Sequence, residues 1–199
     1  MYQVILKSGK DASVRRFHPW VFSGAIKKIK SEEGREAEPQ EGEIVKVTDN
    51  KGNFLGTGHY QNGSIMVRIL SFKEEEINEG FWTERIQEAY DLRSKLKLTD
   101  NERTNIYRLI HAEGDGLPGL IIDYYAGTAV IQSHSIGMHY AKEDIVKALK
   151  NVFGTSLKAI FDKSEDTLPK NGPIQTEDKY IYESEEYSSI GVEHGCKFK

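Results

Sequence analysis

The sequence lacks several features that would define other classes of protein. Its 199 residues include a single cysteine, Cys196, which excludes an internal disulfide and a cysteine-based zinc site. It has no apolar run long enough to span a membrane, and the apolar stretch near Met1 is too short for a signal peptide. We therefore expect a folded protein of a reducing compartment, the cytoplasm.

Basic residues are scarce over most of the chain but not at its start. The formal net charge is −4, which by itself argues against a nucleic-acid partner. Residues 1–30, however, hold seven Lys and Arg against Asp11, a local charge of +6, whereas residues 73–199 carry −7. A solvated charged surface would explain this excess. It is also the electrostatic footprint of an RNA-binding face.

The first part of the chain has the pattern of a small β-barrel. Runs of β-prone residues alternate with tight turns, and residues 31–40 form an acidic loop. No helix follows Gly56-Thr57-Gly58, so we expect a strand bulge there rather than a nucleotide-binding loop. We expect Trp20 in the core and a structural, not catalytic, His18. The expected strands are residues 4–6, 42–48, 53–60 and 64–70.

The second part mixes helices and strands. A helix is predicted from about Phe81 to Leu96, with Asn78 as its N-cap. A second amphipathic helix is predicted over residues 138–152, and Gly154 ends it. Together with the barrel, this gives an α+β protein in which one helix lies on a small second sheet. The expected strands are residues 107–111, 120–125, 128–135, 157–161 and 180–182.

The hairpin of residues 107–125 has an unusually elaborate turn. Pro118 and three glycines shape it, and it carries Glu113 and Asp115 without a basic residue between them. The two acids could be solvated turn residues, or the loop could face a partner or an active site. A small hydrolase using His111 with these acids is a third possibility. That would need a deep pocket, which a hairpin tip seldom supplies.

The same stretch carries a resemblance to a known family. Arg108-Leu-Ile-His-Ala-Glu-Gly-Asp-Gly-Leu-Pro-Gly-Leu-Ile-Ile-Asp-Tyr-Tyr125 resembles a signature of the bacterial large-subunit ribosomal RNA methyltransferases that modify cytosine C5. His18-Pro-Trp-Val-Phe-Ser-Gly24 and Val67-Arg-Ile-Leu70 resemble the PUA domain, an RNA-binding barrel, at the front of those enzymes. The spacing of Arg85, Ile86, Ala89 and Arg93 is similar to that of their connecting helix.

The resemblance implies a PUA-like barrel at 1–73, a linker and helix at 74–100 and a central α+β domain at 101–199. It also implies ribosomal RNA as the partner, bound by the basic amino-terminal face. The expected RNA-binding residues are Lys7, Lys10, Arg15, Arg16, His18, Lys27, Lys28 and Arg68. The loop expected to face another domain or an active site comprises Glu113, Asp115, Gly116, Leu117, Pro118 and Gly119.

Two departures from the family bear on catalysis. Asp162–Pro169 stands where the family has an arginine-rich segment, and residues 192–199 resemble only the strand that leads into the methyltransferase domain. S-adenosylmethionine (SAM) needs a strand, a glycine-rich turn and a helix, which we do not find. We interpret Cys196 as a structural residue. We therefore expect this chain to recognise RNA, with no catalytic residues, metal or cofactor of its own, while the parent enzyme uses SAM. A free-standing PUA-type RNA-binding protein is the alternative.

Overall fold

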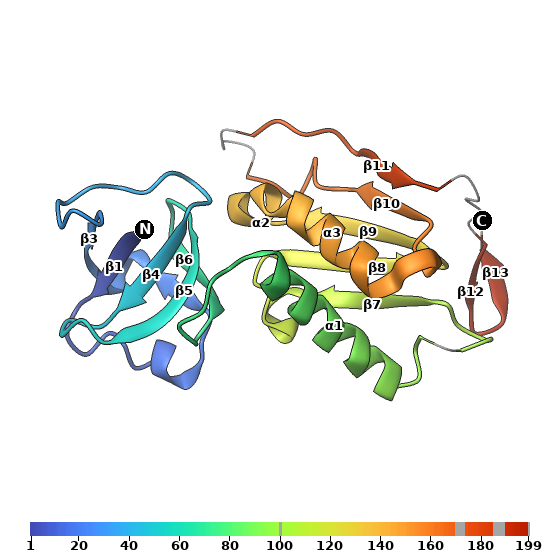
Figure 1. Ribbon diagram of the computed structural model, residues 1–199, viewed down its shortest axis with the longest axis horizontal. Coiled ribbons are helices and arrows are strands. Elements are labelled where there is room, and N and C mark those ends of the chain that lie inside the picture. Colours follow the sequence, from blue (N-terminus) through green and yellow to red (C-terminus); the bar gives the residue numbers. More distant parts are fainter. Residues whose placement is uncertain (100, 170–173, 185–189, 199) are drawn as a thin grey trace. The chain divides into compact units, whose positions relative to one another are not determined.

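Contacts between residues divide the chain into two compact units. The computed structural model describes residues 1–99, 101–169, 174–184 and 190–198. Unit 1 comprises Met1–Glu76 and Ser135–Tyr140, and unit 2 comprises Ile77–His134 and Ala141–Lys199. Unit 1 is a strand-rich barrel and unit 2 is a sheet with helices packed on it, so the expected α+β class is confirmed (Figure 1).

Unit 1 contains a six-stranded sheet in the order β2-β6-β5-β4-β1-β3. Only three residues, Ser23–Ala25, connect β2 to β3, although these strands lie at opposite edges of the sheet. The sheet must therefore curl round until its two edges approach each other, as in a barrel. The strands are β1 (Tyr2–Leu6), β2 (Trp20–Phe22), β3 (Ile26–Lys30), β4 (Ile44–Thr48), β5 (Phe54–Tyr60) and β6 (Ile65–Ser71).

Alternate residues of these strands fill the barrel. Val21 and its cross-strand partner Val67 are 1% and 0% exposed, which places both in the core. Trp20 therefore lies on the opposite face of β2 and is only partly buried, so the prediction of a core tryptophan is wrong. The predicted bulge in β5 is confirmed. β5 carries an extra residue against β4 just before Gly56, whereas the register shift at Gly58 leaves the extra residue on β6. An added Cβ at Gly58 would lie 2.1 Å from the carbonyl oxygen of Arg68.

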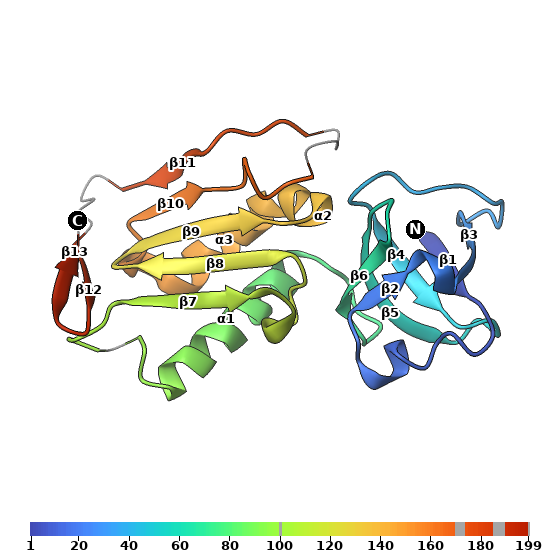
Figure 2. The ribbon, with the colours of Figure 1, turned by 180° about the vertical axis from the view of Figure 1, so that it is seen from behind.

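Unit 2 is a five-stranded sheet in the order β11-β10-β9-β8-β7, in which only β9 and β10 run parallel. Two helices, α1 (Glu79–Lys95) and α3 (Lys142–Phe153), lie on the same face of this sheet (Figures 1 and 2). The connecting helix is thus part of this layer, not only a link. The strands are β7 (Ile106–His111), β8 (Leu120–Tyr125), β9 (Thr128–Ser133), β10 (Ala159–Asp162) and β11 (Lys179–Glu183).

The helix boundaries follow local chemistry in part. Asn78 caps α1, since its side chain accepts a hydrogen bond from the backbone N–H of Phe81 at 3.2 Å. Trp82, Ile86 and Arg93 of α1 are buried. Leu96, the predicted end of the helix, lies beyond the last turn and is exposed. The helix predicted over 138–152 is interrupted at Ala141. Its first turns form α2 (Ile136–Tyr140), which belongs to unit 1.

α2 packs closely against the barrel. A Cβ on Gly137 would lie 2.1 Å from Cγ of His59 on β5, so only glycine fits at this position. Gln61 adds a hydrogen bond by accepting from the backbone N–H of Ile136 at 3.2 Å. This packing accounts for the break between α2 and α3. α2 follows the surface of the barrel, whereas α3 follows the sheet of unit 2.

Residues 191–198 form a hairpin instead of the single strand expected. β12 (Gly191–Glu193) and β13 (Cys196–Phe198) pair around His194 and Gly195, both of which have positive φ. Hydrogen bonds with residues 103–105 attach this hairpin to the rest of unit 2. Cys196 is exposed, so its interpretation as a structural apolar residue is wrong. In the described part of the chain, no helix is long and apolar enough to cross a membrane.

Candidate nucleic-acid interface

The basic residues of the amino-terminal segment differ in whether their side chains already contact other groups of the protein. Nζ of Lys7 donates to the carbonyl of Gly24 at 2.9 Å, and Lys28 lies 3.7 Å from Glu36. Lys10, Arg16 and Lys27 are exposed, and within the described residues none of the three has a carboxylate partner. These three cations are therefore the ones available to meet phosphate.

Arg15 is already engaged. Its Nε donates to Asp11 at 2.6 Å and its Nη2 donates to Asp49 at 2.7 Å. Hydrogen bonds from Asn53, together with others from Lys51 and the charge of Arg15, lower the pKa of Asp49 to about 2. Arg15 thus connects the turn after β4 to the 3₁₀ helix at Val14–Arg16. This role is structural and could not be seen from the sequence, because Asp49 lies 34 positions away.

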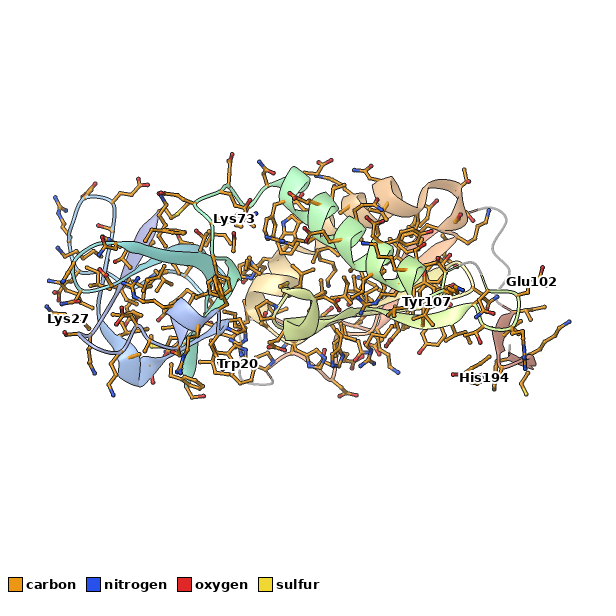
Figure 3. The ribbon with its side chains drawn as sticks, turned by 90° about the horizontal axis from the view of Figure 1, so that it is seen from below. Trp20, Lys27, Lys73, Glu102, Tyr107 and His194 are labelled. Atoms are coloured by element: carbon orange, nitrogen blue, oxygen red, sulfur yellow. The ribbon has the colours of Figure 1, made fainter. Side chains whose placement is uncertain are left out.

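Residues of the amino-terminal segment are spread over unit 1. Figure 3 shows Lys27 and Trp20 at opposite ends of unit 1, although only seven positions separate them in sequence. The chain reverses between β2 and β3, so residues close in sequence reach different sides of the barrel. The side that carries Trp20 also carries aromatic residues.

The outer face of β2 presents a row of rings. The ring centroids of His18 and Trp20 are 5.7 Å apart, and those of Trp20 and Phe22 are 6.3 Å apart, both in edge-to-face arrangements. Nδ1 of His18 accepts a hydrogen bond from the backbone N–H of Trp20 at 3.2 Å, which fixes the imidazole beside the indole. His18 and Phe22 are exposed, and Phe22 retains 47% of its surface. Sequence reasoning missed this row, because a strand of three residues is too short for its alternation to reveal it.

Arg68 continues the same face across the sheet. It lies directly opposite Trp20 on β6, and His59 of β5 lies opposite Arg68 on the other side. Burial, with a smaller contribution from the charge of Arg68, lowers the pKa of His59 to about 4, so His59 is neutral at pH 7. The face therefore carries one cation, Arg68, between a buried neutral imidazole and the exposed rings.

The loop of unit 2 is held by a buried ion pair. Asp115 accepts two hydrogen bonds from the guanidinium of Arg93 on α1, and the two side chains are 6% and 9% exposed. The same carboxylate accepts from the backbone N–H of His111 at 2.6 Å, and Nε of Arg93 donates to the carbonyl of Arg108 at 2.9 Å. Asp115 is therefore a structural residue and not a solvated turn acid.

Other loop residues divide into buried and exposed sets. Leu117, Pro118 and Gly119 are buried, and the N–H of Leu117 donates to the carbonyl of Ala112 at 3.0 Å. Glu113 and Gly116 are exposed, and Gly116 has φ +70° at the end of the 3₁₀ turn. Of the six loop residues singled out from the sequence, Glu113 alone presents an exposed charged side chain.

The geometry does not support acid–base catalysis in this loop. The carboxylate of Asp115 is already bound by Arg93. Nη1 of Arg108 lies 3.4 Å from Nδ1 of His111, and the Arg108 guanidinium forms a bidentate pair with Asp123. An open cleft of about 520 Å³ in unit 2 is lined by residues that include Tyr107, Arg108 and His194, but not by Glu113 or Asp115. Among the described residues, no group of three or more His, Cys, Asp or Glu could hold a metal ion.

A comparison with protein families identifies the barrel. The family described as "PUA-like domain" matches residues 4–72, which span nearly all of β1 to β6. Residues 4–72 are a PUA-like domain. The row of rings on β2 and Arg68 on β6 both lie within the PUA-like domain, as do all the basic residues proposed from the sequence.

Curated relatives match most of the chain. "Ribosomal RNA large subunit methyltransferase I" of Alteromonas mediterranea is 42% identical over 149 residues, covering 74% of this chain and 36% of the relative. The protein of the same name from Vibrio parahaemolyticus is 36% identical over 191 residues, covering 96% of this chain and 46% of the relative. The chain is homologous to these proteins and spans less than half the length of either.

Solved structures show the same fold. A protein of Streptococcus mutans assigned as a SAM-dependent methyltransferase matches with a TM-score of 0.75 at 18% identity. The match covers 100% of this chain and 48% of that protein. A methyltransferase in complex with SAH matches with a TM-score of 0.76 at 17% identity, over 100% and 47% of the two chains. At these identities the likeness establishes the fold alone.

Proposed function

We propose that this chain is the RNA-recognition region of a SAM-dependent ribosomal RNA methyltransferase that modifies C5 of cytosine and works in the cytoplasm. The observation that carries this proposal is the 36% identity over 191 residues to an rRNA methyltransferase, in a chain that includes a PUA-like domain. The local charge of +6 in residues 1–30 supports the same assignment, because phosphate contacts dominate the affinity of proteins for nucleic acids.

The proposed RNA contacts fall into two groups. Lys10, Arg16 and Lys27 are exposed and would neutralise phosphates directly. Lys7, Arg15 and Lys28 make contacts within the protein and would contribute mainly to the local field. His18 and Arg68 lie on the aromatic face of β2 and β6.

The loop after β7 would face the remainder of the methyltransferase. Arg93 and Asp115 fix its conformation, while Leu117, Pro118 and Gly119 pack inward and support it. Exposed Glu113 would then be the side chain that meets the methyltransferase part or the RNA entering it. In a protein that contains both parts, Glu113→Ala should lower methylation while leaving stability nearly unchanged.

The described residues do not fit SAM. β9 is the strand of unit 2 that runs almost directly into a helix, and Gly137 of α2 is the glycine in that connection. The space beside Gly137 is filled by the ring of His59, so no cradle for a cofactor exists there. We derive no chemical step through SAM. In our proposal, methyl transfer belongs to the portion of the relatives that this chain does not span.

Two binding measurements on the 199-residue chain test the proposal. A structured fragment of large-subunit rRNA should bind with an affinity that falls as salt is raised, and calorimetric titration with SAM should give no saturable heat. Saturable SAM binding at micromolar concentration, or the absence of any RNA binding, would contradict it. A free-standing PUA-type RNA-binding protein would give the same two results. The intact mass of the natural protein distinguishes the two proposals, because a methyltransferase that contains this region would be larger than the 199-residue chain.

A further inference from the structure

The outer face of β2 carries more aromatic surface than the barrel needs. The core of the PUA-like domain is completed by Val21, Val67 and their neighbours, without His18, Trp20 or Phe22. Burying a large apolar side chain stabilises the fold, so leaving Phe22 47% exposed gives up stability. Clustered apolar surface of this kind on a folded protein marks a binding site more often than chance.

The rings have the spacing and orientation of a recognition surface. Because strand residues alternate in direction, Trp20 and Phe22 lie on one face of β2, and His18 extends the row from the preceding turn. The centroids of His18 and Phe22 are 6.5 Å apart with planes tilted by 41°. The hydrogen bond between His18 and the backbone of Trp20 orders this row before any ligand arrives.

The charge beside the rings favours a nucleic acid over a protein segment. Arg68 lies opposite Trp20 on the same face of the sheet, and the exposed Arg16 comes two residues before His18. Rings with a guanidinium group beside them match a single strand, whose bases stack on aromatic side chains while its phosphates meet cations. Bases within an A-form helix are already stacked on each other and cannot reach such a surface.

We propose that His18, Trp20 and Phe22, with Arg68 beside them, bind unpaired bases of the RNA by stacking. This inference deepens the proposed function and rests on it, because it names the part of the RNA that the PUA-like domain selects: a loop, bulge or opened end. Each base stacked in this way should strengthen binding about 5- to 150-fold.

Tryptophan fluorescence tests the proposal directly. The chain has two tryptophans, and Trp82 is 2% exposed, so a change in emission on adding RNA reports Trp20. A single-stranded oligouridine should quench the emission, and a duplex RNA of equal length should not. Phe22→Ala and His18→Ala should each weaken oligouridine binding at least fivefold. Phe198→Ala is the matched control, because Phe198 is 51% exposed but lies in unit 2.

The outcomes separate this inference from the function beneath it. Binding of structured rRNA with unchanged Trp20 emission, or with full oligouridine affinity in Phe22→Ala, would overturn stacking and leave RNA recognition standing. The rings would then be a surface for another protein segment. Failure of both RNAs to bind would overturn both proposals. Trp20→Phe retains a ring, so it should abolish the quench while keeping most of the affinity, and a large loss of affinity would count against stacking.

Discussion

Single residues of the hairpin signature have roles that their chemistry alone does not reveal. Glu113 and Asp115 are two positions apart in one 3₁₀ turn, yet Asp115 is buried against Arg93 and Glu113 is exposed. Removing one partner of a buried ion pair leaves an uncompensated charge and typically costs about 3–5 kcal/mol. Asp115, although it stands in a turn like a solvated acid, is therefore mainly a structural residue.

This difference gives a matched pair of variants. Asp115→Ala should lower the free energy of unfolding of unit 2 by about 3–5 kcal/mol, whereas Glu113→Ala should change it by less than about 1 kcal/mol. Urea unfolding followed by Trp82 fluorescence, in a Trp20→Phe background, measures both. Equal effects of the two substitutions would show that the ion pair with Arg93 does not hold the loop.

His59 makes the stability of unit 1 depend on pH. Its pKa is lowered from 6.5 to about 4 in the folded state, so protonation favours the unfolded chain. The free energy of unfolding is therefore unaffected by this group above about pH 6.5. It falls by up to about 3 kcal/mol as the pH falls toward 4. Urea midpoints between pH 7 and pH 4.5 should show this decline. His59→Gln should flatten it, and the exposed His18→Gln should retain it. If the urea midpoint of His59→Gln falls with pH as steeply as that of the original chain, other groups cause the decline.

At the scale of elements, the position of α2 depends on one glycine. A Cβ at Gly137 would overlap the ring of His59, whereas a Cβ at Gly24 would meet nothing within 4 Å. Gly137→Ala should destabilise unit 1 by about 1–3 kcal/mol because His59 or α2 must move, and Gly24→Ala should stay within about 0.5 kcal/mol. Thermal unfolding compares the two, and equal melting temperatures would show that α2 packs loosely on the barrel.

Most elements were predictable where the signal is local. The N-cap at Asn78, the hairpin strands around Pro118 and the bulge beside Gly56 depend on neighbours in sequence, and all three are confirmed. The interruption at Ala141 was not predictable, since neither glycine nor proline marks it. It results from the contact of α2 with β5, a tertiary effect that overrides the helical pattern.

The candidate site was less predictable for the same reason. Trp20 was assigned to the core because large rings usually lie there, and a strand of three residues is too short for its alternation to decide the question. The partners of Arg15 and Asp115 are 34 and 22 positions away. Pairings at such separations follow from the fold and leave no local pattern.

At the scale of the whole molecule, the two units have separate tasks in our account. The PUA-like domain provides cations and rings for RNA, and unit 2 provides a rigid sheet whose loop is fixed by Arg93 and Asp115. The acidic charge of residues 73–199 would repel phosphate, so RNA should bind through the PUA-like domain.

The salt dependence of RNA binding tests this account most directly. The logarithm of the affinity of the chain for an rRNA fragment should fall linearly with the logarithm of salt concentration. The triple variant Lys10→Gln, Arg16→Gln and Lys27→Gln should lower the magnitude of that slope by about 2, at roughly 0.7–0.9 per phosphate contact. Arg15→Gln is the control, because Arg15 is already paired with Asp11 and Asp49, and it should leave the slope nearly unchanged. A triple variant with the slope and affinity of the original chain would contradict RNA recognition by these cations.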